Sequence, residues 1–257
     1  SAAVIGKADE GFLPCIEVNA RVLEKNVPKA CELNDEILFN SLLDDRKNIT
    51  AKIKKECLRM DRAFTSNGHL YALRRCCTGL FEDKKYADML GGIDYYSFLK
   101  DISKKIETNF DEISQNLKNT RNFILSQNGF ITALYGQKES LDIFVENSEK
   151  IFDNLNKNNQ NKKTDTDFKI TEKSEAFEAE TEIVFNAKAG NFKDAGYKYS
   201  GKMEVLKNII NLEYLWNKVR VMGGAYGCGC IFDTDGRVAF YSYRDPNVKS
   251  TFDAYGK

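Results

Sequence analysis

The N-terminal part of the chain places apolar side chains at helical spacing. The pattern predicts a pair of helices over residues 19–45 and a further helical face after them. Breaks are expected at Asn67-Gly68 and at Gly91-Gly92, because such dipeptides favour turns. The further helical face is formed by residues at intervals of three and four, namely Ile49, Ile53, Cys57, Met60 and Phe64.

The middle of the chain changes from helical spacing to extended spacing and back. The β-favouring run over residues 130–135 follows Asn128-Gly129 and predicts a strand. Helical spacing returns over residues 138–155. Residues 154–167 are nearly free of apolar side chains, so they are expected to form a polar linker. Before the strand, an amphipathic helix is predicted from Ile102, Ile106, Phe110, Ile113 and Leu117.

The pattern after the predicted linker indicates strands as well as helices. Residues 181–190 form a predicted strand, and the apolar spacing of residues 201–219 predicts a buried helix. Two apolar runs flank the sequence Asp-Thr-Asp-Gly at residues 233–236. This arrangement predicts a β-hairpin, because Asp-Gly is a favoured turn dipeptide.

One more helix is predicted at the C-terminal end. Asp245 is expected to cap it, with Pro246 as its first residue. That helix has barely begun at Lys257, so the sequence is expected to be truncated. Together these elements predict an α+β fold, in which helices pack on a mostly antiparallel sheet and the N-terminal part is rich in helix.

Charge and composition limit the classes of partner that the sequence leads us to expect. The chain has 38 basic and 38 acidic residues, so charge gives no reason to expect nucleic acid or an anionic membrane as the main partner. The N-terminus lacks the features of a signal peptide, and no run approaches the ~20 apolar residues that span a bilayer. A soluble chain is expected. The odd number of cysteines, seven, favours a reducing compartment over secretion.

One segment is similar to a phosphate-binding loop. Residues 196–203, GYKYSGKM, match the first seven positions of G-x-x-x-x-G-K-[ST], but Met203 stands where a hydroxyl would hold magnesium. A turn in which Gly201 opens the next helix is the favoured interpretation. A nucleotide-binding domain remains an alternative function.

The histidine and cysteine content argues against a metal site in this chain. A zinc hydrolase needs three protein ligands, and H-E-x-x-H or H-x-x-E-H peptidases need two histidines, whereas His69 is the only histidine. A structural role is therefore favoured for His69. Only one residue separates Cys228 from Cys230, and the adjacent pair Cys76-Cys77 falls on a predicted helix, so both pairs are interpreted as packing residues.

The sequence RVMGGAYGCGC at residues 220–230 carries the remaining candidate chemistry. Arg220 offers a planar fork of donors for a carbonyl or carboxylate, and Tyr226 offers a phenolic donor for an oxyanion. The glycines of this motif would let another backbone approach closely. From these residues alone, a simpler alternative is favoured: a helix end followed by a strand, with Arg220 in a salt bridge and Tyr226 on an apolar face.

A longer pattern around this motif resembles a known family. The segments EYLWNKVRVMGGAYGCGC and GRVAFYSYRDPNVKSTFDAY lie within about residues 196–255. They closely resemble the C-terminal half of the pitrilysin/insulinase family of zinc metallopeptidases, in its presequence-protease and falcilysin branch. A second resemblance covers roughly residues 10–152, where GHLYALRRCC, GGIDYYSFLKDI and the predicted strand before GQKESL look like the third repeat unit of these proteins.

The resemblance implies parts of a clamshell of four related α/β units that encloses a peptide. Residues 1–153 would be a partial third unit, residues 154–167 the polar linker, and residues 168–257 a partial fourth unit. In the family, the zinc and its H-x-x-E-H ligands belong to the first unit. Zn²⁺ would therefore be bound in the parent enzyme and not by this chain.

The resemblance also implies roles for the motif at residues 220–230. In the family, an Arg and a Tyr of the fourth unit reach the substrate at the zinc site, and by motif they fall on Arg220 and Tyr226. Arg220 would hold a substrate carbonyl or carboxylate, and Tyr226 would donate to the oxyanion of the tetrahedral intermediate. The residues expected to bind the peptide backbone are Gly223, Gly224, Ala225 and Gly227.

The expected function is that of the non-metal half of a zinc-dependent metalloendopeptidase that degrades unstructured peptides. Its partners would be a peptide substrate and the zinc-bearing N-terminal half of the same polypeptide, and the chain alone is expected to be inactive. A catalytically silent peptide-binding or assembly module of the same fold is the alternative. The expected compartment is the bacterial cytoplasm, or an organelle matrix if the source is eukaryotic.

Overall fold

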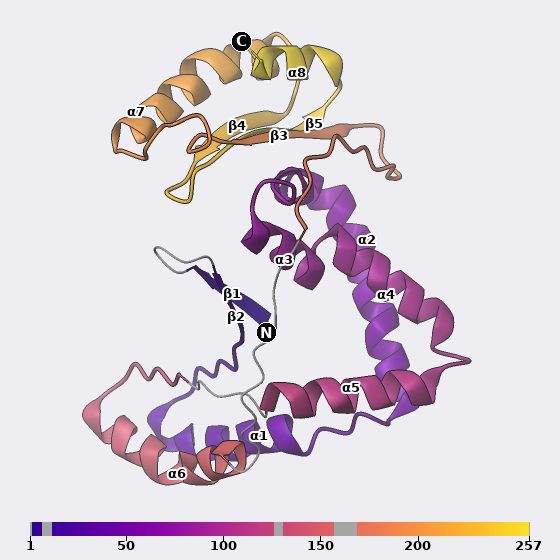
Figure 1. Cartoon of the computed structure of the whole chain (residues 1–257), viewed down its shortest axis with the longest axis vertical. Coiled ribbons are helices and arrows are strands. Elements are labelled where there is room, and N and C mark those ends of the chain that lie inside the picture. Colours follow the sequence, from indigo (N-terminus) through magenta and orange to yellow (C-terminus); the bar gives the residue numbers. More distant parts are fainter. Residues whose placement is uncertain (1, 7–11, 126–130, 157–168, 257) are drawn as a thin grey trace. The chain divides into compact units, whose positions relative to one another are not determined.

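The structure of the chain is a computed structural model that describes residues 2–6, 12–125, 131–156 and 169–256. The chain divides into two compact units, each built from separate stretches of sequence, whose elements are labelled in Figure 1. The first unit comprises residues 16–54 and 101–166. The second comprises residues 2–15, 55–100 and 167–257. Neither unit is therefore a single continuous stretch of the sequence.

Two helices lie side by side in the first unit. α1 (Val27–Phe39) follows the short 3₁₀ helix η1 (Glu24–Asn26), and α6 (Lys138–Asn156) runs along α1 in Figure 1. The Lys150 ammonium of α6 lies 2.6 Å from the Asp35 carboxylate of α1. The helix predicted over residues 138–155 is therefore confirmed. Of the predicted linker, residues 154–156 belong to α6 and the rest lie outside the described residues.

A third helix fastens the chain that leaves α1. The Ser114 hydroxyl of α5 (Phe110–Leu125) donates to the carbonyl oxygen of Leu43 at 2.7 Å, and the Arg121 guanidinium donates to that of Phe39 at 3.2 Å. These bonds satisfy backbone carbonyls at and beyond the end of α1, so the connection is held without secondary structure of its own.

Two predictions of helix extent in the first unit are wrong. Residues 19–45 hold one α-helix rather than a pair, and this helix begins where Pro28 can occupy its first turn at no hydrogen-bonding cost. The helix predicted through residues 102–117 is interrupted, because α4 (Ile93–Lys105) ends before α5 begins. The Thr108 hydroxyl donates to the Lys105 carbonyl, which competes with continued helical bonding.

The strand predicted over residues 130–135 is also wrong for the part that the structure describes. Residues 131–135 have no regular secondary structure, and Tyr135 is fully exposed. A β-favouring run forms a strand only where a neighbouring strand takes up its backbone hydrogen bonds. The described residues supply no such neighbour here. Asn128-Gly129 and Phe130 lie outside them.

Three antiparallel strands form the main sheet of the second unit. Their order is β3 (Val184–Asn191), β5 (Arg237–Asp245) and β4 (Gly227–Phe232). The predicted hairpin is confirmed, because β4 and β5 pair across a turn in which Gly236 has a φ of 109°. The strand predicted over residues 181–190 is confirmed, although it begins at Val184.

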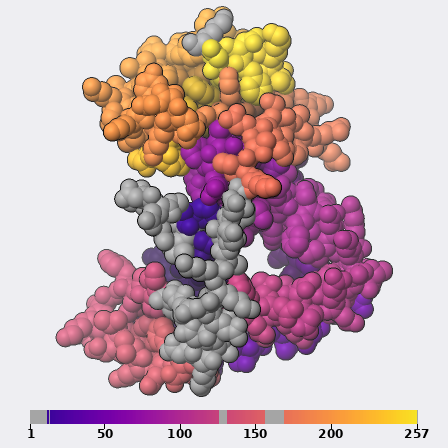
Figure 2. Space-filling view, in the orientation of Figure 1, coloured from indigo at the N-terminus to yellow at the C-terminus, as the bar shows by residue number. Residues whose placement is uncertain are grey.

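Helices cover one face of this sheet. The π-helical segment η2 (Ile210–Val221) directly continues α7 (Lys202–Ile209), and α8 (Lys249–Tyr255) follows β5. Figure 1 shows α7 and α8 over the same face. Figure 2 shows these orange and yellow segments as a continuous surface. The α+β fold class is therefore confirmed. The buried core between sheet and helices consists of Leu215, Val219, Ala225, Cys230 and Tyr255.

Two predictions for this layer are wrong. The helix over residues 201–219 buries only one stripe, because a helix lying on a sheet face has its other side free; Val205 and Leu212 are exposed. Asp245 does not cap the last helix. It ends β5, and α8 begins at Lys249 because the Asp245 carboxylate is used in a buried cluster beside the turn.

The rest of the second unit is mainly helical. Residues 55–76 of α2 (Arg46–Cys76) belong to this unit. They contain the predicted break at Asn67 as a kink within one helix, with φ of −131° and ψ of 30°. The break at Gly91-Gly92 is confirmed, since α3 (Glu82–Gly91) ends there. β1 (Ala2–Gly6) and β2 (Phe12–Ile16) form a separate two-stranded sheet.

Candidate functional site

The motif at residues 220–230 begins where η2 ends. The amides of Gly224 and Ala225 donate back to the carbonyls of Arg220 and Val219, at 2.9 and 3.2 Å. Gly224 has a φ of 81°, a conformation that favours glycine, and a Cβ on Gly223 would lie 2.5 Å from the Val219 oxygen. These glycines therefore end the helix and place Arg220 in its last turn.

The side chain of Tyr226 projects from the edge of the sheet. Its backbone amide donates to the carbonyl of Arg244 at 3.1 Å, which extends the pairing of β4 with β5 by one residue. The Tyr226 side chain packs edge-on against the Tyr243 ring, with 5.6 Å between centroids. Tyr226 nevertheless remains 60% exposed, so its phenol is available to a ligand.

Two guanidinium groups flank the Tyr226 ring. The Cζ atom of Arg220 lies 6.0 Å from its centroid and that of Arg244 lies 5.6 Å from it. Arg220 also lies 4.0 Å from the ring centroid of Trp216, one helical turn earlier. Both distances to Tyr226 fall in the range of cation–π attraction. We call Trp216, Arg220, Tyr226 and Arg244 the Tyr226 site.

The charges of the Tyr226 site have no internal counterion. Among the residues that the structure describes, neither Arg220 nor Arg244 forms an ion pair with a carboxylate. The salt bridge that the simpler alternative expects for Arg220 is therefore wrong for the described residues, whereas the helix end followed by a strand that it also expects is confirmed. The fork of donors on each arginine is free to bind a carbonyl or a carboxylate.

Arg244 is held in an unfavourable backbone conformation. Its φ is 48°, and it alone has a positive φ among the described residues other than glycine. A non-glycine residue in this region costs about 1–3 kcal/mol, and such residues cluster at functional sites. Because Tyr226 bonds to the Arg244 carbonyl, this conformation also sets the backbone position of Tyr226.

The alternating glycines of the motif make room for aromatic rings. Gly227 pairs with Tyr243, and Gly229 pairs with Tyr241, on adjacent strands. A Cβ on Gly229 would lie 2.8 Å from the Tyr241 hydroxyl oxygen, and one on Gly227 would overlap the Tyr243 ring. The tyrosine rings therefore lie flat over the glycines, on the face of the sheet opposite α7 and η2.

The alternating cysteines of the motif face the helices. The Cys228 thiol donates to the Leu215 carbonyl at 3.3 Å, and the Cys230 thiol reaches the Lys207 carbonyl at 3.8 Å. Burial raises the pKa of Cys230 to about 11, so the thiol is neutral at physiological pH. Both side chains pack against helix backbone, which agrees with their interpretation as packing residues.

A buried carboxylate fixes the turn after β5. Asp245 is fully buried and accepts hydrogen bonds from the Ser242 and Thr251 hydroxyls at 2.6 and 2.8 Å. It also accepts one from the Asn247 backbone amide at 2.9 Å. The Asn247 side chain donates to the Gly223 carbonyl at 2.5 Å. The cluster thus ties the end of β5 to the loop that ends η2.

His69 packs on the aromatic face of the sheet. Its ring centroid lies 4.7 Å from that of Tyr243, 6.0 Å from that of Tyr241 and 6.2 Å from that of Phe185. Burial lowers the pKa of His69, which favours the neutral imidazole. A Cβ on Gly68 would overlap the Phe185 ring, so the glycine lets α2 approach β3. These contacts agree with a structural role for His69.

The segment similar to a phosphate-binding loop presents a carboxylate instead of a binding site. The Tyr199 hydroxyl donates to Glu204 at 3.0 Å, and Glu204 also binds Lys207. Glu204 lies in the first turn of α7, where a phosphate would have to bind. Its negative charge would repel a phosphate group.

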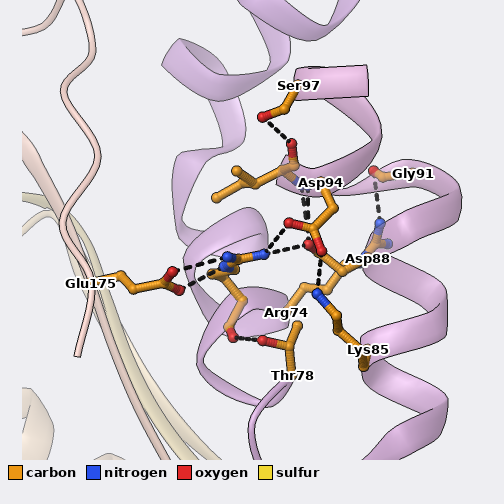
Figure 3. Close-up of polar contacts among 10 residues, drawn as sticks. Arg74, Thr78, Lys85, Asp88, Gly91, Asp94, Ser97 and Glu175 are labelled. Atoms are coloured by element: carbon orange, nitrogen blue, oxygen red, sulfur yellow. Dashed lines mark hydrogen bonds and ion pairs between the residues drawn. The ribbon is translucent and has the colours of Figure 1, made fainter. Parts of the chain in front are cut away.

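A second polar cluster lies among the helices of this unit. Arg75 of α2 bonds to Asp88 and Asp94 at 2.9 and 2.7 Å, and to Glu175 at 2.7 Å. Figure 3 shows Asp88 and Asp94 on helical ribbons and Glu175 on an extended segment, with Lys85 bound to Asp94. The Arg75 guanidinium lowers the pKa of Glu175. The charged groups of this cluster bind one another, so the cluster is suited to holding segments of the chain together.

The described residues offer no metal centre. Residues 12–125, 131–156 and 169–256 contain no group of three or more His, Cys, Asp or Glu side chains arranged to hold a metal ion. In the same part of the chain, no helix combines the length and apolar character needed to cross a membrane.

Comparisons with known proteins identify the family. The model of the PreP C-terminal domain matches residues 174–257, and a model described as associated with subfamily C of the M16 peptidases matches residues 4–102. This chain belongs to the presequence-protease branch of the pitrilysin (M16) peptidase family. The matches correspond to the C-terminal region of these peptidases.

Several curated relatives match most of the chain. Protein HypA of Clostridium perfringens is 35% identical over 249 residues, which are 97% of this chain and 25% of the relative. Presequence protease 1 of Arabidopsis thaliana, a chloroplastic/mitochondrial protein, is 31% identical over 85% of this chain and 21% of its own. The mitochondrial presequence protease of Yarrowia lipolytica is 27% identical over 89% of this chain and 23% of the relative. The chain thus spans about a quarter of their length.

The structure brings together the two residues expected to carry the chemistry and adds two that the sequence analysis missed. Trp216 precedes Arg220 by four residues, so helical spacing could have found it. Arg244 could have been found from the hairpin register, because pairing Gly227 with Tyr243 places Tyr226 opposite Arg244.

The four small residues of the motif have packing or turn roles. Ala225 lies in the core, and the amides of Gly224, Ala225 and Tyr226 are already bonded within the chain. The ligand contacts of the motif thus fall mainly to the side chains of the Tyr226 site. Peptide binding by Gly223, Gly224, Ala225 and Gly227 stays a prediction.

Proposed function

We propose that this chain supplies substrate-binding and oxyanion-stabilising residues to a zinc-dependent metalloendopeptidase that degrades unstructured peptides. The observation that carries the proposal is the exposed Tyr226 phenol flanked by Arg220 and Arg244, for which the described residues provide no carboxylate partner. The names of its relatives, presequence proteases, support a peptidase role.

In this proposal the Tyr226 site binds and polarises the peptide. Arg220 presents its fork of donors to a substrate carbonyl or carboxylate, and its position is set by stacking on Trp216. Tyr226 donates its phenolic proton in a hydrogen bond to the oxyanion that develops when a peptide carbonyl is attacked. The Tyr243 ring limits where the phenol can point.

The zinc ion of the parent enzyme would be held by other residues. The described part of the chain lacks a suitable group of ligands, so we assign no zinc ligand and no step of the reaction at zinc to this chain. Its partner would be the zinc-bearing N-terminal half of the same polypeptide, and the chain alone would be inactive. The bacterial cytoplasm is the proposed compartment, or an organelle matrix for a eukaryotic source.

Peptide hydrolysis by the complex of this chain with that zinc-bearing half tests the proposal. Tyr226→Phe should lower turnover by about 10²–10³-fold, because one oxyanion donor is lost. Tyr197→Phe removes the hydroxyl of another exposed tyrosine and should leave turnover unchanged. Turnover by Tyr226→Phe equal to that of the unchanged chain would refute the role of Tyr226, and activity of the chain alone would refute the division of labour.

A catalytically silent peptide-binding or assembly module is the second candidate. One observation favours this module: Gly223, Gly224 and Gly227 have structural roles that require no ligand. This candidate predicts that the same complex binds the peptide without hydrolysing it, and that a chelator leaves peptide binding unchanged.

A further inference from the structure

Arg244 stands in the Tyr226 site without an assigned role. The resemblance to the family gives roles to Arg220 and Tyr226 only. Yet the Arg244 guanidinium lies closer to the Tyr226 ring centroid, at 5.6 Å, than the Arg220 guanidinium does, at 6.0 Å. Two cations beside one exposed ring repel each other unless an anion joins them.

The backbone shows that the place of Arg244 is fixed by the fold. Its φ of 48° would suit glycine, and yet an arginine occupies the position. The carbonyl of Arg244 binds the Tyr226 amide. Asp245 beside it is anchored by four hydrogen bonds, from Asn186, Ser242, Asn247 and Thr251. The buried cluster therefore holds the backbone from which the Arg244 side chain extends into solvent.

We propose that Arg244 and Arg220 together bind a carboxylate of the peptide, which makes Arg244 a specificity-determining residue of the Tyr226 site. The proposal rests on the proposed peptide-binding function. Each guanidinium can donate two parallel hydrogen bonds to a carboxylate. Among the described residues, no carboxylate forms an ion pair with either. The carboxylate could belong to an acidic side chain or to the C-terminus of the peptide.

Binding to the whole 257-residue chain tests this without peptidase activity. Four forms of one unstructured peptide without tryptophan are compared, with Glu or Gln at one internal position and with a free or amidated C-terminus. Binding is measured by anisotropy of a dye on the peptide. Emission of Trp216, which is the only tryptophan and stacks on Arg220, reports whether the peptide reaches the site.

Loss of the carboxylate that the site uses should weaken binding about tenfold at low salt and less at high salt. Weakening by Gln identifies an acidic side chain, and weakening by the amide identifies a C-terminal carboxylate; either result supports the proposal. Equal binding of all four forms, or no binding of any, overturns it.

Variants assign the discrimination to Arg244. Arg244→Gln should bring the four affinities together, and Arg244→Lys should restore part of the difference because it keeps the charge. Arg244→Gly also removes the guanidinium and suits the positive φ, so it serves if the Gln variant does not fold. Lys218→Gln is the control, because it removes one charge from the same helical segment as Arg220. It should leave the difference in affinity among the four peptides unchanged.

Each outcome separates this inference from the proposed function. If Arg244→Gln and Arg244→Gly weaken all four peptides equally, Arg244 only positions Tyr226 and the proposal is wrong. Full turnover by Tyr226→Phe in the zinc-bearing complex would defeat the oxyanion role but leave carboxylate discrimination standing. If Arg244→Gln loses turnover but keeps the difference in affinity among the four peptides, carboxylate discrimination by Arg244 is wrong and the oxyanion role of Tyr226 stands.

Discussion

At the residue scale, the Gly-Cys-Gly-Cys sequence separates two chemistries on the two faces of β4. Gly227 and Gly229 leave space for the rings of Tyr243 and Tyr241, while the cysteine thiols between them reach helix carbonyls. A side chain in place of either glycine would displace a tyrosine ring. Because Tyr243 also packs against Tyr226, the space over Gly227 helps to define the position of the candidate donor.

Gly229→Ala should destabilise the chain by about 1–3 kcal/mol, because the added Cβ would push Tyr241 off its rotamer. Gly190→Ala in β3 is the matched control. Its Cβ would lie 3.6 Å from Val238, an ordinary contact, so the free energy of unfolding should change by no more than about 0.5 kcal/mol. Urea unfolding measures both variants, and a Gly229→Ala protein as stable as the unchanged chain would contradict this account.

At the element scale, the end of β5, the end of η2 and the start of α8 meet through one carboxylate. Asp245 lies at the end of β5, Thr251 belongs to α8, and Asn247 carries the connection to Gly223 after η2. The carboxylate is buried without a cation, and hydroxyl and amide donors satisfy it instead. Such a group keeps the elements in register, because no other arrangement supplies all its donors.

Asp245→Asn should lower the free energy of unfolding by about 2–3 kcal/mol, because its amide group would turn a donor toward the hydroxyls or the Asn186 amide. Asp253→Asn, at an exposed position of α8, loses only a surface pair with Lys249 and should cost well below about 1 kcal/mol. Thermal unfolding of both variants provides the comparison. Equal losses would mean that the buried cluster is not what fastens these elements.

At the scale of the whole molecule, ion pairs join distant parts of the sequence within each unit. Arg75 and Glu175 are 100 residues apart, and the Nε and Nη2 atoms of Arg75 donate to the two carboxylate oxygens of Glu175 at 2.7 and 2.9 Å. Phe177, two residues further on, lies under the same guanidinium, 5.6 Å from its Cζ atom. The extended segment before β3 is thereby attached to α2.

Glu175→Gln should reduce stability by about 1 kcal/mol at pH 7 and have no effect in acid. The pKa of Glu175 is lowered in the folded chain, so the stability it contributes is present above its unfolded pKa and is lost as pH falls through the folded value. Urea midpoints of the unchanged chain and the variant should therefore converge once the pH lies below the folded pKa of Glu175. Glu178→Gln on the same segment is the control; a gap that persists in acid would contradict the charge-based explanation.

Local patterns along the sequence determined the α+β class, the hairpin, the helix over residues 138–155 and the pairing of Arg220 with Tyr226 in one motif. Each depends on neighbours a few residues apart, and periodicity and turn dipeptides record such neighbours directly. The resemblance to the family supplied the roles.

Tertiary structure decided the rest, because burial and partners depend on residues far along the chain. Residues 131–135 have β propensity but no neighbouring strand among the described residues, so they form none. Asp245 looks like a helix cap in sequence, yet its carboxylate is taken by Ser242 and Thr251 in the folded chain. Arg244 enters the Tyr226 site only once β5 lies beside β4, since backbone pairing rather than sequence proximity brings the second guanidinium to the ring.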